Sequence, residues 1–444
     1  MNTLIGVFLV LGVMILVHEW GHFIVARFFG VRVDVFSIGF GPRLFGFKRG
    51  ATDYRISALP LGGYVRMAGQ DLSEVDSNDV APTGAPDELM SKPRWQRALI
   101  SFAGPAVNLV LPILLLASFY AMKGLPYPAY LDKPLVLSGL PQTSPLAKAG
   151  IKDGDQVVSV NDVPTPTWSK VNTFLLQAAQ DGIVRFRIAR QGTEQTVEIK
   201  AADLRNADRA LGNLPVPALV GPVERGMPAS RAGLKRGDVI VAVNGTPVGS
   251  WYDFFDQIRH SNGQVLNTTV RRNSTEMNIA IRPVQDKDEE GQVAWRIGVG
   301  PGGEWAFKDM AVSASVREAS DETLGATVKL FGVLGRLFSG KLSVRQLRSF
   351  VGIAALAGQA VEEGPVDVIN MMAMISLNLG ILNLLPIPIL DGGNILLLTL
   401  EGIRRRDFSL AFKERFVQVG LVFLLVFFAY VMYNDVVRLL PIHS

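Results

Sequence analysis

Residues 4–29 read LIGVFLVLGVMILVHEWGHFIVARFF, an apolar run whose second half carries His18, Glu19 and His22. A membrane-spanning helix needs about 20 mostly apolar residues, because a helix pairs its own backbone N–H and C=O groups inside hydrocarbon. The run is therefore expected to span a bilayer. The three residues before it carry no basic charge, and no small-residue cleavage site precedes Arg27, so we do not expect a cleaved signal peptide.

The composition of the whole chain is that of a membrane protein. Of its 444 residues, 48% are hydrophobic and 19% are charged, which argues against a disordered chain and against an ordinary soluble enzyme. The chain has no Cys, so any metal site must use His and carboxylate ligands. Three further stretches, at 98–122, 368–385 and 416–433, are long and apolar enough to cross a membrane. We therefore expect a polytopic α-helical membrane protein with four transmembrane helices.

Lys and Arg residues gather in two of the loops between these stretches, at 27–97 and 404–415. Because cytoplasmic loops carry an excess of Lys and Arg, both loops are expected on the cytoplasmic side, and residues 124–364 on the opposite side. The net charge is only +4 and the positive charge lies beside membrane segments, so the sequence does not support nucleic-acid binding.

The long middle of the chain contains an internal repeat. PLAKAGIKDGD at 145–155 corresponds to PASRAGLKRGD at 228–238, and the match continues at the same offset of 83 to Trp168 and Trp251. Each copy predicts a Gly-Asp turn, a short Val/Ile strand, an Asn-containing turn, a helix such as 251–260, and further strands such as 264–271. The pattern resembles tandem PDZ domains of the bacterial, circularly permuted kind, which bind peptides by adding a strand to an exposed sheet edge.

A further apolar segment follows the repeats. Residues 321–338 are rich in Leu, Val and Phe and predict an amphipathic helix. Such a helix either lies along the membrane surface or packs on the second repeat, and both interpretations stay open.

His18, Glu19 and His22 form an H-E-x-x-H sequence inside the first apolar run. Positions four apart share a helix face, so both imidazoles can bind one Zn²⁺ while the intervening Glu reaches a water molecule. Ionisable groups inside a membrane span are costly, so this cluster indicates a functional site. The alternative is a polar face packed against another helix.

A catalytic zinc site uses three protein ligands. The other two histidines, His260 and His443, are predicted on the opposite side of the membrane, so a carboxylate is expected. Asp391 ends the third apolar stretch, in NLLPIPILDGG at 383–393. The two prolines exclude a continuous helix there and predict extended backbone, which membrane depth tolerates only in protein or beside a cavity. The alternative is a helix-capping Asp at the interface.

These motifs together resemble a known family. H-E-x-x-H in a first span, N-x-x-P-x-P-x-L-D-G at 383–392 and PDZ units between them resemble site-2 intramembrane metalloproteases, specifically the bacterial regulator-of-sigma-E protease branch. GFG at 39–41, LGGY at 61–64 and GPAVN at 104–108 extend the resemblance over nearly the whole chain. It implies Zn²⁺ held by His18, His22 and Asp391, with Glu19 as the general base.

The resemblance also implies substrate-binding residues. Asn383 matches a position that holds the substrate main chain, and 55–67, with Gly62, Gly63 and Tyr64, matches a membrane-associated β-hairpin that presents an edge strand to the unwound substrate. Asn108, in the second apolar stretch, either orients a ligand or bonds across helices. The chain departs from the family pattern at Asn394, where His is usual, and at Ser349-Phe350, where Gly-Pro is usual.

The predicted organisation follows from the repeats, the spans and this resemblance. Residues 1–30 form the first transmembrane helix, 31–97 a cytoplasmic loop with the hairpin, 98–123 the second transmembrane helix, 124–220 and 221–306 two inserted extracytoplasmic PDZ domains, 307–364 a linker with the amphipathic helix, 365–394 the third transmembrane helix with the Asp motif, 395–415 a cytoplasmic loop, and 416–444 the fourth transmembrane helix with a short extracytoplasmic tail.

The resemblance implies a zinc intramembrane endopeptidase of the bacterial inner (cytoplasmic) membrane, with its active site near the cytoplasmic face and its PDZ domains in the periplasm. The implied partners are the lipid bilayer and single-span membrane substrates, either an anti-sigma factor already cut by a first protease or remnant signal peptides. The PDZ domains would act as a size filter, or would bind new peptide termini.

Two other functions are compatible with parts of the sequence. A membrane-anchored PDZ scaffold or chaperone with a vestigial metal site would have no use for Glu19 or Asp391. A zinc transporter would be expected to have inverted repeats and several polar spans.

Overall fold

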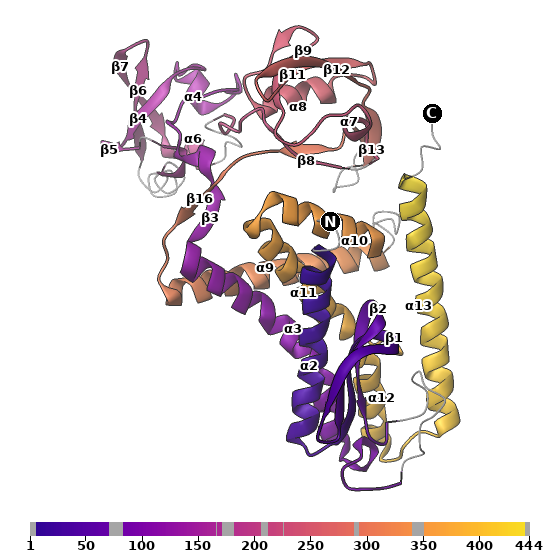
Figure 1. Ribbon diagram of the computed structural model, residues 1–444. Coiled ribbons are helices and arrows are strands. Elements are labelled where there is room, and N and C mark those ends of the chain that lie inside the picture. The colour runs from indigo at the N-terminus through magenta and orange to yellow at the C-terminus, as the bar shows by residue number, and fades with distance from the viewer. Residues whose placement is uncertain are drawn as a thin grey trace. The chain divides into compact units, whose positions relative to one another are not determined.

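The computed structural model describes residues 6–70, 83–165, 167–170, 182–205, 212–224, 226–287, 293–339 and 350–439 (Figure 1). The described residues before Pro126 and after Lys308 form one compact unit, and residues 126–308 form a second. The first unit holds the apolar helices, and the second holds the sequence repeat.

Four helices of the first unit are long and apolar enough to cross a membrane, which confirms the four predicted spans. They cover Val10–Phe28, Arg94–Lys123, Pro365–Asn383 and Ala411–Tyr433. The corresponding elements are α2 (Val13–Phe28, continuing the π-helical turn η1 at Val7–Gly12), α3 (Arg94–Lys123), α11 (Pro365–Asn383) and α13 (Leu410–Leu439).

Small residues bring α2 and α11 against α3. A Cβ on Gly21 of α2 would lie 2.7 Å from the carbonyl oxygen of Ala103, and a Cβ on Gly380 of α11 would lie 3.1 Å from that of Pro105. Glycine at both contacts lets the helix backbones approach closely, as is common between membrane helices. Helix α3 is therefore the shared support of α2 and α11.

A proline in α3 strengthens its contact with α11. Pro112 has no N–H, so the carbonyl of Asn108 one turn earlier has no helical donor. Ser376 Oγ of α11 donates to that carbonyl oxygen at 2.9 Å. The Asn108 carbonyl, buried inside the protein, needs a donor, and the hydroxyl of the neighbouring membrane helix supplies it.

Three more helices lie in segments that the sequence analysis assigns to a linker and a loop. They are α9 (Val312–Phe338), α10 (Phe350–Glu363) and α12 (Asp391–Arg404). Helix α9 begins nine residues before the predicted 321, and its buried Ala319 joins an apolar core with Leu116 and Phe119 of α3. Tyr120 Oη also donates to Glu322 of α9 at 2.5 Å. These contacts tie α9 to α3; the membrane-surface interpretation stays a prediction.

The chain is not helical between α11 and α12, as the two prolines predict. The backbone there folds into tight turns instead of the expected extended conformation, with the N–H of Ile387 donating to the carbonyl of Leu385 at 2.7 Å and the N–H of Leu390 to that of Ile387 at 3.2 Å. Ile389 has a φ of 80°, which β-branched residues rarely adopt. Strain of this kind costs about 1–3 kcal/mol and persists where surrounding structure over-determines it, commonly at functional sites.

The predicted hairpin packs beside α2 (Figure 1). Strands β1 (Val33–Arg49) and β2 (Thr52–Met67) are both bent, so the first part of β1 pairs with 63–67 on one side and with 53–56 on the other. Phe36 and Val65 bury their side chains with Ala26 of α2 and Ile100 of α3. Residues 63–67 consequently form one edge of this sheet, next to α2.

The second unit contains two sheets with the same strand order. In the first copy, β4 (Gln156–Val160), β5 (Val163–Pro164), β6 (Ile183–Arg190) and β7 (Thr193–Lys200) are ordered β5-β4-β6-β7. In the second, β9 (Val239–Val243), β10 (Thr246–Pro247), β11 (Leu266–Arg272) and β12 (Thr275–Ile281) are ordered β10-β9-β11-β12. The predicted helix of the second copy is α8 (Trp251–Arg259). At the offset of 83 its counterpart in the first copy begins at Trp168, where 168–170 are helical, and the rest of it lies outside the described residues.

Short elements complete the described chain. They are η2 (Leu89–Ser91), β3 (Leu125–Pro128), η3 (Ala129–Asp132), α4 (Pro145–Lys148), α6 (Ala201–Arg205), β8 (Val220–Val223), α7 (Pro228–Arg231), β13 (Val284–Lys287), β14 (Val293–Arg296), β15 (Val299–Pro301) and β16 (Trp305–Lys308).

An equivalent ion pair holds each copy of the repeat. Arg190 donates to both carboxylate oxygens of Asp155 at 2.6 Å, and Arg272 donates to both oxygens of Asp238 at 2.7 Å. Each Asp is the last residue of a repeated sequence and is almost fully buried. The same contact therefore occurs at the same place in both sheets.

Asp155→Asn is expected to loosen the first copy of the repeat. Two hydrogen bonds from Arg190 hold the pKa of the Asp155 carboxyl below its ordinary value, so the ion pair stabilises the fold above about pH 4, and that stability is lost as the pH falls further. Hydrogen exchange of the β4 and β6 amides in the full chain should be about tenfold faster in the variant at pH 7.

Lowering the pH should shrink this difference, because acid removes the ion pair from the wild type as well. Exchange in β9 and β11 serves as the internal control, since that copy keeps its own pair. A difference that grows toward acid pH would contradict the assignment.

Candidate metal centre and active site

Helix α2 supplies the first part of the site. His18 and His22 lie one turn apart on its buried face, with exposed fractions of 7% and 8%. Their Nε2 atoms are 3.3 Å apart. The four-residue spacing therefore does bring the two imidazole rings together.

Asp391, the first residue of α12, supplies the third side chain. Its Oδ2 lies 3.3 Å from His18 Nε2, and its Oδ1 lies 3.4 Å from His22 Nε2. Gly392 and Gly393 make this approach possible, because a Cβ on either would lie within 2.3 Å of a backbone oxygen in the turns before α12. The tight turns and the two glycines thus allow the Asp391 carboxylate to lie next to the histidines of α2.

The three side chains fit a zinc ion. Zinc with ligand bonds of about 2.0–2.1 Å and tetrahedral angles separates neighbouring ligand atoms by about 3.3–3.4 Å. The two imidazole nitrogens are 3.3 Å apart, and each lies 3.3–3.4 Å from the Asp391 oxygen that faces it, Oδ2 for His18 and Oδ1 for His22. Two imidazoles with one carboxylate form a donor set that zinc accepts. Within the described part of the chain, these three His and Asp side chains form a group close enough to share one ion.

A backbone group orients His22. Its Nδ1 lies 2.7 Å from the carbonyl oxygen of Ile100 in α3. A carbonyl only accepts, so the His22 proton is on Nδ1 and the lone pair is on Nε2, which faces His18 and Asp391. Helix α3 thus sets the tautomer of one candidate ligand.

Gly104 of α3 lies directly against both histidines. A Cβ at this position would lie 2.3 Å from His22 Nε2 and 2.8 Å from His18 Cε1. Any side chain would displace the rings, so the rings can share an ion only if this residue is glycine. In the sequence, Gly104 stands out only as part of the motif at 104–108. Nothing in the residue types or their spacing predicts its contact with the two histidines.

Glu19 faces the hairpin. A Cβ on Gly63 would lie 3.1 Å from Glu19 Cγ, so glycine at 63 lets β2 pass close to this carboxylate. The backbone of Val65, on the same strand, also lies near this carboxylate. The sheet edge at 63–67 therefore holds Glu19 beside the His18–His22–Asp391 cluster.

The structure brings one further predicted residue to this cluster. Asn383, the last residue of α11, has its Nδ2 3.2 Å from His18 Nε2. Tyr64 lies elsewhere: its ring stacks on Phe40 at 5.9 Å, and its hydroxyl is hydrogen-bonded to Arg55. A Cβ on Gly62 would also meet the Phe40 ring. Successive strand residues face opposite sides, so of the three hairpin residues only Gly63 adjoins the candidate site.

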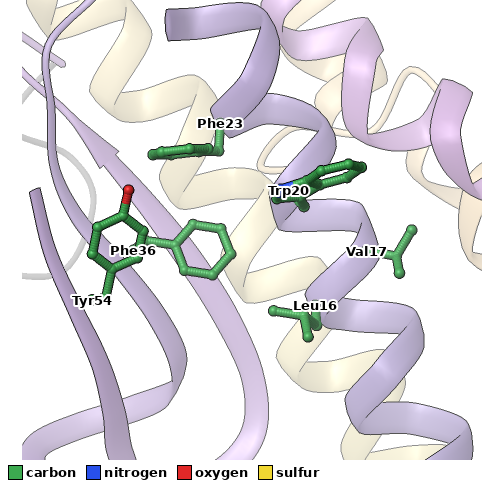
Figure 2. Close-up of a pocket in the computed structure, with 6 residues that line it drawn as sticks. All are labelled: Leu16, Val17, Trp20, Phe23, Phe36 and Tyr54. Atoms are coloured by element: carbon green, nitrogen blue, oxygen red, sulfur yellow. The ribbon is translucent and has the colours of Figure 1, made fainter. Parts of the chain in front are cut away.

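A separate apolar pocket of about 410 Å³ lies between α2 and the hairpin (Figure 2). It is lined by Leu16, Val17, Trp20, Phe23, Phe36 and Tyr54. Figure 2 shows Phe36 and Tyr54 of the hairpin near Phe23 of α2, and the Phe23 and Phe36 rings are 5.4 Å apart. None of the polar cluster residues lines this pocket.

The sequence of the whole chain matches a known family. Residues 6–427 match the profile described as Peptidase family M50. The chain belongs to this family. A Neisseria meningitidis protein named as a zinc metalloprotease is 32% identical to this M50 peptidase, over 99% of the chain and 100% of the relative. The Escherichia coli regulator of sigma-E protease RseP is also 32% identical, over 97% of both chains, and Yersinia pestis protease RseP is 33% identical over the same shares.

The family match and the named relatives show that this M50 peptidase is a zinc-dependent metalloprotease, as the sequence analysis predicts. With its four apolar helices, it is a bacterial inner-membrane protein.

Neither departure from the family pattern changes one of the three candidate ligands. Asn394 is in the first turn of α12, where its N–H donates to the carbonyl of Leu390 at 3.2 Å. Ser349 lies outside the described residues, and Phe350 begins α10.

Proposed function

We propose that this M50 peptidase is an intramembrane endopeptidase that cleaves membrane-spanning segments of single-span proteins. The main support for this proposal is that His18, His22 and Asp391 converge, with Glu19 beside them, between helices whose other faces are apolar. Four ionisable groups in such a setting are costly to maintain unless they serve a function.

His18, His22 and Asp391 would hold Zn²⁺, and Glu19 would act as the general base. When bound, Zn²⁺ polarises the peptide carbonyl and makes water more acidic. Glu19 takes a proton from the attacking water as its oxygen bonds to the carbonyl carbon. Glu19 then returns that proton to the nitrogen as the C–N bond breaks, and the other water proton stays on the new hydroxyl, so the products are a carboxylic acid, which ionises in water, and an amine. The close approach of the hairpin at Gly63 would keep the Glu19 side chain in place for both transfers.

The substrate must be unwound before it can be cut, because a helix uses its carbonyls in its own hydrogen bonds. The sheet edge at 63–67 supports a place for the unwound segment, since it pairs with β1 on one side only. An extended peptide can add to such an edge through main-chain hydrogen bonds. Asn383 would bind the substrate main chain, and Gly63 would leave room for that segment beside Glu19. Gly62 and Tyr64 face Phe40 instead, so a role for them in substrate binding would have to come from the far side of the hairpin.

The substrate class comes from the relatives and from the repeat. One relative is named regulator of sigma-E protease, which supports a membrane-anchored anti-sigma factor already cut by a first protease as substrate, with remnant signal peptides as a second class. The two matching sheets, with helix α8 between β10 and β11 in the second copy, support the assignment of 124–220 and 221–306 as PDZ domains. We place them in the periplasm as a size filter, with the active site near the cytoplasmic face. A PDZ scaffold with a vestigial metal site is the competing function.

A reconstituted cleavage assay tests this function. Full-length protein in liposomes is incubated with a reporter of one apolar span and short flanks, and mass spectrometry locates the cut. We expect a cut inside the span, loss of cleavage with a zinc chelator and recovery with added Zn²⁺. A reporter with the same span and a folded periplasmic domain should stay intact. If zinc-loaded protein leaves the short reporter uncut, the protease proposal fails and the scaffold function is favoured.

Asn383→Leu is expected to lower kcat/KM for the short reporter by about 100-fold, because it removes an amide donor without changing the side chain's size much. Zinc content should stay that of the wild type, since Asn383 lies near His18 but is not an assigned ligand. Asn278→Leu, on an exposed position of β12, is the matched control. Unchanged kinetics in the Asn383 variant would contradict the role.

A further inference from the structure

Asn108 is a buried amide in α3 that touches a candidate zinc ligand. Its side chain is 0% exposed, and its Nδ2 lies 3.2 Å from His18 Nδ1. Its Oδ1 has no hydrogen-bond partner among the described residues. Its backbone carbonyl accepts a separate hydrogen bond from Ser376 Oγ of α11.

Two amides flank the same imidazole ring. Asn108 Nδ2 lies 3.2 Å from His18 Nδ1, and Asn383 Nδ2 lies 3.2 Å from His18 Nε2. An amide nitrogen only donates, and a neutral imidazole accepts at one nitrogen because the other carries the proton. Both amides therefore cannot present nitrogen at once, and one of them must turn its oxygen to the ring.

The chemistry selects Asn108 as the amide that turns. A half-turn exchanges Oδ1 and Nδ2 with almost no change in shape, and Asn108 Oδ1 has no other described bond to break. With Oδ1 toward the ring, His18 donates its proton from Nδ1, and its lone pair is on Nε2. That is the atom which lies 3.3 Å from both His22 Nε2 and Asp391 Oδ2.

We propose that Asn108 is a positioning residue whose Oδ1 accepts the His18 Nδ1–H and so reserves His18 Nε2 for the metal ion. The inference rests on the proposed function, in which His18 is a zinc ligand. It gives His18 the counterpart of the Ile100 carbonyl that orients His22. Helix α3 thereby fixes the tautomer of both imidazoles, one with a backbone acceptor and one with a side chain.

Loss of this acceptor should weaken zinc binding without unfolding the protein. An apolar residue at 108 would leave the Nδ1–H buried and unpaired, so the proton would shift to Nε2 and compete with the ion. Removing a hydrogen-bond partner of a metal-binding His typically costs about 10- to 100-fold in metal affinity. Asn108→Asp keeps an acceptor at the same place and should restore most of that affinity.

The test measures the zinc dissociation constant of the purified full chain by competition with a chromophoric chelator. We expect Asn108→Leu to bind zinc about 10- to 100-fold more weakly and Asn108→Asp within about fivefold of the wild type. Ser376→Ala removes a hydroxyl that donates to the Asn108 backbone carbonyl and not to its side-chain amide, so this variant should bind as the wild type does. Thermal unfolding in excess chelator checks that each variant is folded, and Asn108→Ala replaces the Leu variant if that one does not fold.

The outcomes separate this inference from the proposed function. His18→Ala is included, and a variant that binds zinc as tightly as the wild type would overturn the ligand assignment itself. If His18→Ala loses zinc but Asn108→Leu does not, only the role of Asn108 is overturned. Equal loss in the Leu and Asp variants, with wild-type melting, would also overturn it, because a retained acceptor would then not matter.

Discussion

Glu19→Gln is expected to lower cleavage of a single-span reporter by about 10²- to 10⁴-fold while the protein keeps its zinc. The amide has nearly the shape of the carboxylate, but it cannot take a proton from water at neutral pH. The three candidate ligands do not include Glu19, so ion binding should not change. Reporter cleavage in liposomes and zinc content by elemental analysis measure the two effects separately.

Glu194→Gln provides the matched control for this substitution. Glu194 is exposed on β7 of the second unit and should leave cleavage unchanged. If Glu19→Gln instead cleaved as fast as the wild type, another group would be the base. If it lost zinc together with activity, Glu19 would be a ligand and the assignment of the third ligand to Asp391 would need revision.

Gly104→Ala is expected to reduce zinc affinity by at least about 100-fold and to abolish cleavage. The new methyl group would lie 2.3 Å from His22 Nε2 and 2.8 Å from His18 Cε1, which no relaxation of the rings can accept while they share an ion. Alanine is a better helix former than glycine by about 1 kcal/mol, so α3 itself should not be weakened. Chelator competition gives the affinity, and circular dichroism confirms the helix content.

Gly332→Ala separates the contact from the general effect of alanine in a helix. Gly332 lies in α9, where a Cβ would meet no atom within 4 Å. This variant should keep both zinc and cleavage. Wild-type zinc affinity in Gly104→Ala would show that the two rings do not bind the ion in the arrangement described.

Some features are local enough to be predicted from the residues alone. Four apolar stretches give four helices, because in hydrocarbon a long apolar segment has no other way to pair its backbone. His18 and His22 meet because a spacing of four is one helical turn. The repeat offset predicts two equivalent sheets, and the pairs Asp155–Arg190 and Asp238–Arg272 confirm them.

Other features depend on how distant segments meet. Asp391 lies 369 residues after His22 in the chain. Only the turns before α12 bring its Oδ1 to 3.4 Å from His22 Nε2. The prediction of extended backbone there was wrong because prolines exclude a helix without choosing between strand and turns. Tyr64 is separated from the cluster by strand alternation, which a motif match does not show.

The sequence by itself therefore determined the spans, the His18–Glu19–His22 face and the repeat, because each depends on a backbone period or on hydrophobicity within one segment. Tertiary structure alone decided that Gly104 must lack a side chain, that Ile100 and Asn108 of α3 face the two imidazoles, and that Gly63 of β2 lies against Glu19. The physical reason is that these roles belong to backbone groups and contact distances between helices, and neither leaves a mark in the type or spacing of residues.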